Sequence, residues 1–100
     1  MNRPYYSEYV RHALRFYTRN LSPKPEFKSE ADRNNWYACA VTLKGCTELH
    51  LKILVDVYSG YDTLADNVYE ASKKYGINQA VIWDLMKAVE RKVAKRRGLM

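Results

Sequence analysis

The sequence predicts an all-α fold: a bundle of four to five helices that contains a C-terminal helix-turn-helix. Apolar residues recur at three- and four-residue steps along most of the chain, and no segment sustains period-two alternation. Gly and Pro interrupt this pattern at intervals that suit helices of ordinary length. With 100 residues, 47% of them hydrophobic, the chain is long enough for a single domain with a modest core.

The first part of the domain, residues 1–27, is expected to hold one helix and a connector. The helix should run from Pro4 to about Arg19, because Pro suits a first helical position and apolar residues follow at helical spacing. Its other side carries a basic stripe of Arg11, Arg15 and Arg19. We interpret the stripe as solvated surface rather than as phosphate contacts, since long charged side chains normally lie outside. Two prolines near residue 24 then prevent a helix.

The second part, residues 28–60, is expected to be a helical pair. Ser29 can cap the first helix of the pair, and Gly45 ends it. Thr47 can cap the second, which continues to Ser59 and Gly60. The segment from 52 to 58 is also rich enough in β-branched residues to form a strand, which is the alternative at this point.

The third part, residues 61–97, is expected to be the helix-turn-helix. Asp62 or Thr63 caps a supporting helix that stops at Gly76, and Asn78 caps a long final helix. This motif needs small residues where its helices meet, a tight turn and an apolar inner face. Candidates for these features are Ala71, Ser72, Gly76, Ile77, Ile82, Leu85 and Val89.

The final helix carries the candidate DNA-contacting residues. Gln79 is the best base reader, because glutamine can bond to the edge of adenine in a bidentate manner. Asn78 could approach a base if it is not used as a cap. Trp83 could touch a thymine methyl, pack on the supporting helix or form a dimer interface, and packing is favoured. The predicted base-contacting set is Asn78, Gln79, Trp83 and Lys87, while the helical phase turns Asp84 partly away.

Positive charge is densest between Lys87 and Arg97, which holds six of the 17 basic residues and one acid. Charge at this density favours contact with a phosphate backbone. The predicted phosphate-contacting residues are Arg91, Lys92, Lys95, Arg96 and Arg97, with Lys73 and Lys74 on the supporting helix. A solvated basic tail is the alternative. Binding to a membrane surface is less favoured, because the core occupies the apolar side of this helix.

Other classes of function have little support. The two histidines are isolated and there is no nucleophile or phosphate-loop motif, so we expect no enzyme activity and no cofactor. Cys39 and Cys46 lie seven residues apart, about 10 Å in a helix, which predicts buried free thiols with neither a disulfide nor a metal site. No apolar run suggests a membrane span or signal peptide, so a cytoplasmic location is expected.

Four segments carry a resemblance to a known family: CTELHLKILVDVY at 46–58, TL at 63–64, YGINQ at 75–79 and RKV at 91–93. From Leu43 to Leu99 the chain resembles the fourth conserved region of bacterial sigma-70-type factors and their phage-borne relatives. The resemblance implies that 46–58 precedes the reader, that Thr63 and Leu64 open the supporting helix, and that the helix after Gly76 contacts promoter DNA in the major groove. It thus implies a small transcriptional regulator of phage or mobile-element type.

These observations together predict a protein that binds double-stranded DNA. RNA polymerase is a possible further partner, and a homodimer is expected because one reading helix gives limited specificity. The alternative is a helical protein–protein interaction module with a Tyr-rich surface, since the chain has nine tyrosines, with Tyr5, Tyr6, Tyr9 and Tyr17 close in sequence.

Overall fold

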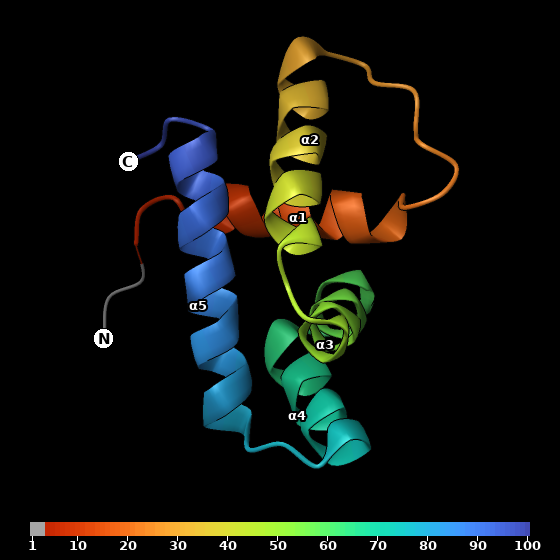
Figure 1. The fold of residues 1–100 in the computed structure, drawn as a ribbon, viewed down its shortest axis with the longest axis vertical. Helices are drawn as coiled ribbons and strands as arrows, with labels where there is room; N and C mark the ends of the chain where they lie inside the picture. Colours follow the sequence, from red (N-terminus) through yellow and green to blue (C-terminus); the bar gives the residue numbers. More distant parts are fainter. Residues whose placement is uncertain (1–3) are drawn as a thin grey trace.

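A computed structural model describes residues 4–100, which form five helices (Figure 1). The helices are α1 (Ser7–Arg19), α2 (Glu30–Lys44), α3 (Glu48–Ser59), α4 (Leu64–Tyr75) and α5 (Gln79–Arg96). No strand occurs in this range, and residues 52–58 lie inside α3. The predicted all-α class and number of helices are therefore confirmed, and the strand alternative for 52–58 is wrong.

Two helices organise the packing. In Figure 1, α5 runs along one side of the molecule, with α2 beside its C-terminal part and α4 beside its N-terminal part. Helix α1 crosses behind α5 and α2 and packs against α2, α3 and α5. All five helices contribute to one core, whose largest fully buried side chains are Tyr58, Leu14, Leu43, Ile53, Leu54, Ile82, Met86, Val10, Val57, Val68, Val93 and Cys39. The Cα radius of gyration, 13.0 Å, is that expected of a compact domain of this length.

The predicted helix starts after α1 are confirmed by hydrogen bonds from side chains to the first turn. Ser29 accepts from the Asp32 amide, and Thr47 from the His50 amide. Thr63, rather than Asp62, caps α4 by accepting from the Asp66 amide. These bonds satisfy amides that no preceding carbonyl can reach, which is why polar caps mark helix starts in the sequence.

Two details of the expected helices are wrong, the start of α1 and the place of Cys46, and the inner side of α5 includes one more residue than expected. Helix α1 begins at Ser7, because Pro4 and the next two residues form a turn closed by the Ser7 amide on the Pro4 carbonyl, 3.1 Å apart. On α5, Leu85 is half-buried and packs against the core as expected, and its neighbour Met86, which was not expected there, is fully buried. Cys46 lies beyond the end of α2 rather than inside a helix.

A buried asparagine fixes the corner between α3 and α4. The Asn67 side-chain amide donates to the Val57 carbonyl at 2.9 Å and to the Asp62 carbonyl at 3.3 Å. Gly60 lies so close beneath it that a Cβ atom there would be 2.7 Å from the Asn67 side chain. The corner therefore requires glycine for close approach, and it sets where α4 begins relative to α3.

Within residues 4–100, no helix is long and apolar enough to cross a membrane. Both thiols are free, as predicted, with Cys39 buried and Cys46 half-buried. Burial raises the pKa of Cys39 to about 12, so this thiol stays protonated in the folded protein at neutral pH.

Candidate nucleic-acid interface

A three-residue turn joins α4 to α5. Gly76 adopts the left-handed conformation (φ 64°, ψ 39°), which residues with a side chain rarely accept. The Ile77 amide donates to the Ser72 carbonyl at 3.1 Å, and the Ser72 hydroxyl donates to the Ile77 carbonyl at 2.5 Å. Ile77 packs against the core. Ser72, Gly76 and Ile77, which the sequence predicted at this point, thus meet at one turn.

The predicted base-contacting residues differ in their surroundings. Asn78 is exposed, and its side-chain oxygen accepts from the Ala80 amide at 2.8 Å and so caps α5. Gln79 and Lys87 are exposed. Trp83 is half-buried against the core, and the Arg11 guanidinium carbon lies 6.0 Å from the centroid of its ring. Asp84 is exposed and lies one helical turn from Ala80 and from Lys87.

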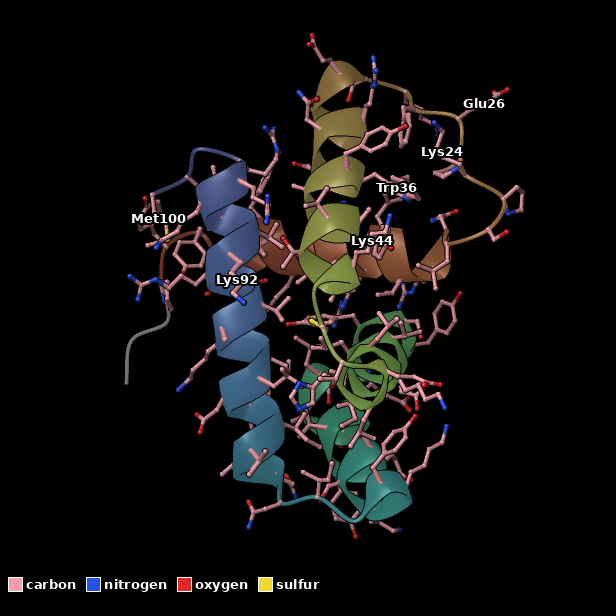
Figure 2. The ribbon with its side chains drawn as sticks, in the orientation of Figure 1. Lys24, Glu26, Trp36, Lys44, Lys92 and Met100 are labelled. Atoms are coloured by element: carbon pink, nitrogen blue, oxygen red, sulfur yellow. The ribbon has the colours of Figure 1, made fainter. Side chains whose placement is uncertain are left out.

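We use the name α5 basic face for the exposed cations of α5: Lys87, Arg91, Lys92, Lys95 and Arg96. Helix α5 continues to Arg96, so these residues belong to an ordered helix and not to a frayed tail. Lys92 lies on the side of α5 that Figure 2 turns toward the viewer. Arg97 is different, because it is half-buried and its Nε donates to Asn35 Oδ1 on α2.

The two predicted phosphate contacts on α4 lie in its last turn. Lys73 and Lys74 are both exposed. Lys74 pairs with Asp56 on α3 at 2.9 Å, and the hydrogen bond and charge of Asp56 raise the pKa of Lys74. The pair is open to solvent, so it stabilises little and leaves Lys74 charged.

Sequence reasoning missed Glu90, the second acid of α5. Its residue surface is 3% exposed, and its Oε2 accepts from the Tyr58 hydroxyl at 2.5 Å and from Arg11 Nε at 3.0 Å. Burial, followed by the charge of Glu90, raises the pKa of Tyr58 well above its usual value. A signal existed, because Glu90 follows Met86 by four residues and therefore lies on the buried side of the helix.

The basic stripe on α1 is not the solvated surface that the sequence predicted. Arg11 is half-buried and paired with Glu90, and Arg15 is half-buried. Arg19 is exposed, but its guanidinium donates to the carbonyls of Ser59 and Gly60 and lies over the Tyr61 ring, 4.2 Å from the ring centroid. The physical reason is that α1 crosses the centre of the molecule, so its outer side meets α5 and the corner between α3 and α4.

The tyrosines expected to form one surface do not share one environment. Tyr6 is buried in the core, and Tyr17 is half-buried with its ring 5.1 Å from that of Trp36. Tyr5 and Tyr9 are exposed. Trp36 also packs edge-on against Phe27, and Figure 2 shows it on the side of α2 that faces the connector carrying Lys24 and Glu26. Part of the aromatic content is therefore used in packing.

Among residues 4–100, no group of three His, Cys, Asp or Glu side chains is placed to hold a metal ion. Comparison of the chain with known protein families, with curated proteins and with solved structures finds no match.

Proposed function

We propose that the protein binds double-stranded DNA and acts as a small transcriptional regulator, with α4 and α5 as a helix-turn-helix. The N-terminal part of α5 would enter the major groove, and the α5 basic face would contact phosphates. The observation that carries the proposal is that one of the two acids of α5 is buried and the other is exposed. Glu90 is buried against Arg11 and Tyr58, so Asp84 is the exposed acid on a helix with five exposed cations.

This imbalance matters because duplex DNA is surrounded by condensed counterions. Each cation that neutralises a phosphate releases counterions, which gives affinity that does not depend on sequence and that falls with salt. Helix α5 is also held rigidly, since its inner side contributes six buried residues and its N-terminus is capped. A rigid helix loses little freedom when it docks.

Base reading has weaker support than phosphate contact. Gln79 and Lys87 remain the best candidates for groove contacts, because both are exposed, Gln79 at the start of α5 and Lys87 about two turns further along. Trp83 has a packing role that does not depend on DNA. Asp84 would repel phosphates and could accept from the amino group of cytosine in the major groove.

The competing proposal is a protein–protein interaction module. Tyr5 and Tyr61 are the most exposed aromatic residues, at 81% and 87%. Tyr5 precedes α1 and Tyr61 lies between α3 and α4, so these two residues do not by themselves define one aromatic patch. An aromatic interface would respond little to salt, whereas DNA binding would weaken steeply, so salt distinguishes the two proposals. A homodimer and a contact with RNA polymerase also remain predictions.

The proposal is tested by titrating labelled duplex DNA with the protein and with a triple variant of the α5 basic face. Arg91→Ala, Lys95→Ala and Arg96→Ala remove three exposed charges from one side of α5. We expect affinity at low salt to fall by about a hundredfold, since each phosphate contact is a charge-assisted bond.

The matched control removes the same charge from other elements. Lys28→Ala, Arg33→Ala and Lys52→Ala change three exposed residues outside α4 and α5. If affinity depends on net charge alone, both triple variants will weaken binding equally and the assignment to α5 is wrong. Failure of the unaltered protein to bind any duplex at low salt would refute the proposed function.

A further inference from the structure

A groove lies between α2 and the C-terminal end of α5, two helices that pack against each other (Figure 1). Its volume is about 420 Å³, which is within the range of sites for small ligands, and we call it the Tyr37 groove. Within residues 4–100 its lining is Asn34, Tyr37, Ala38, Val41, Arg96 and Arg97. This lining contains two arginines and no acid, so the groove favours an anionic ligand.

The α2 side of the Tyr37 groove is apolar and exposed. Tyr37 and Val41 lie one helical turn apart, so they share a side of α2, and they are 38% and 50% exposed. Neighbouring rings hold Tyr37 in place, with the Trp36 centroid at 5.2 Å and the Phe27 centroid at 6.1 Å from its own. A flat group that docks here would bury apolar surface against a ring that is already positioned.

Tyr37 separates this groove from a second hollow on the side of the connector. The second hollow is lined by residues of both charges, among them Lys24, Arg33, Glu26 and Glu30. Lys24 Nζ lies 5.1 Å from the centroid of the Tyr37 ring, and the Arg33 guanidinium carbon lies 6.0 Å from it. Because these four residues line the second hollow and not the Tyr37 groove, they leave the α5 side of the ring accessible.

The cations of α5 lead into the Tyr37 groove. Arg96 is exposed and belongs both to the α5 basic face and to the lining of the groove. Arg97 also lines the groove, but it is half-buried and its Nε donates to Asn35. A negatively charged strand that follows the α5 basic face can therefore reach Tyr37 without crossing an acid of the groove lining.

We propose that the Tyr37 groove binds an unpaired nucleotide of a DNA strand that leaves the duplex held by α5, with the base against Tyr37 and the phosphate at Arg96. The inference rests on the proposed function and extends its interface from α5 to α2. An aromatic ring among cations is the combination by which proteins hold single strands, because every unpaired base has a free face. A base inside a duplex has none to offer.

An acidic protein segment with apolar side chains is the other class of ligand that matches the charge and the apolar side of the groove. The continuity of the groove with the α5 basic face favours the nucleic-acid strand, since cations repeat along that path as phosphates repeat along a strand.

Duplexes with single-stranded tails test the proposal on the full chain. Fluorescence anisotropy compares a blunt duplex with the same duplex carrying a thymine tail of about six nucleotides, on one strand or on the other, or an abasic tail of equal length. We expect the thymine tail on at least one strand to strengthen binding about tenfold, the usual worth of a base stacked on a ring. The abasic tail has the same phosphates and should give little of this gain. No gain from either thymine tail, or an equal gain from the abasic tail, would overturn the inference.

Substitutions of Tyr37 assign the gain to the groove, with each variant measured as the ratio of its Kd values for blunt and tailed duplex. Tyr37→Leu should remove the gain, whereas Tyr37→Trp should keep it, because tryptophan also stacks on bases. Tyr61→Leu is the matched control, since Tyr61 is exposed and has the Arg19 guanidinium carbon 4.2 Å from its ring centroid but lies outside the groove. A gain that survives Tyr37→Leu, or that Tyr61→Leu removes as completely, would show that the tail binds elsewhere.

Nuclear magnetic resonance of the ¹³C-labelled protein locates the tail directly. The tailed duplex should shift the Tyr37 ring signals and the Val41 methyl signals, and the blunt duplex should not. A peptide of glutamate and leucine residues is the probe for a protein segment. If this peptide moves those signals and the tail does not, the groove takes a protein ligand and the inference is wrong.

The same titrations separate this inference from the proposed function. If the triple variant of α5 loses affinity for the blunt duplex while no tail adds affinity to the unaltered protein, DNA binding stands and the groove site does not. If the unaltered protein binds no blunt duplex at low salt, the proposed function fails and this inference fails with it.

Discussion

Arg11, Tyr58 and Glu90 come from three helices and meet at one buried carboxylate. Glu90 Oε2 on α5 accepts from Arg11 Nε of α1 at 3.0 Å and from the Tyr58 hydroxyl of α3 at 2.5 Å, so these contacts join the three helices. A buried charge is stable only when it is paired and hydrogen-bonded, so the three side chains depend on one another. At this scale the network fixes how α5 is rotated and keeps one acid off its outer side.

Glu90→Gln should destabilise the protein by about 2 kcal/mol, because Arg11 loses its countercharge while most of the hydrogen-bonding shape is kept. Urea unfolding followed by circular dichroism measures the change. Glu48→Gln is the matched control, since Glu48 pairs with Lys52 at 3.4 Å in full contact with solvent. A Glu90→Gln variant as stable as the Glu48→Gln variant would contradict the role given to this network.

Because the Cys39 thiol is buried, we expect the free energy of unfolding to decrease at alkaline pH. Burial raises its pKa from 9.0 to about 12, so above pH 9.0 the thiol ionises in the unfolded chain but not in the folded one. The stability that the protonated Cys39 thiol contributes to the folded state is fully present below pH 9.0 and is lost as pH rises toward 12. Between about pH 8 and about pH 10, Cys39→Ala should lose about 1 kcal/mol less stability than the unaltered protein.

Cys46→Ala is the comparison for that measurement, because burial also raises the pKa of this half-buried thiol but by less than that of Cys39, so its effect on the pH dependence should be smaller. Equal pH slopes for the unaltered protein and Cys39→Ala would show that Cys39 ionises equally well in the folded state.

Helix ends are the part of this fold that the sequence predicts best. A cap is a local event, so Ser29, Thr47, Thr63 and Asn78 act on amides two or three residues away. The start of α1 was harder to predict, because Pro4 there closes a turn with Ser7 instead of opening the helix. The faces of α1 and α5 depend on contacts between distant residues, which periodicity does not encode. Arg11 with Glu90 is such a contact.

Two glycines test the role of the turn between α4 and α5. Gly76 has a positive φ and open space around it, so Gly76→Ala should cost about 1 kcal/mol for conformational reasons alone. Gly45 ends α2 with φ −81°, and a Cβ atom there would make an ordinary contact at 3.6 Å. Gly45→Ala should therefore be neutral or slightly stabilising. Thermal or urea unfolding of both variants gives the comparison, and equal costs would contradict the conformational role of Gly76.

For the whole molecule, a formal net charge of +6 was evident from composition, but its distribution was not. Sequence periodicity indicated that α5 has a polar side with many cations. It did not reveal that Glu90 is turned inward, that Arg97 is held by Asn35, or that α2 and the end of α5 flank a groove. Each of these depends on how helices far apart in sequence cross, which is a property of the packed molecule.

The central claim is that this molecule binds duplex DNA through phosphates, and the salt dependence of binding tests it most directly. Fluorescence anisotropy of a labelled duplex gives Kd at several salt concentrations for the unaltered protein. If the protein contacts four phosphates, raising the salt from about 50 to about 200 mM should weaken binding about a hundredfold. No binding at the lowest salt, or a Kd that hardly changes over this range, would contradict the account.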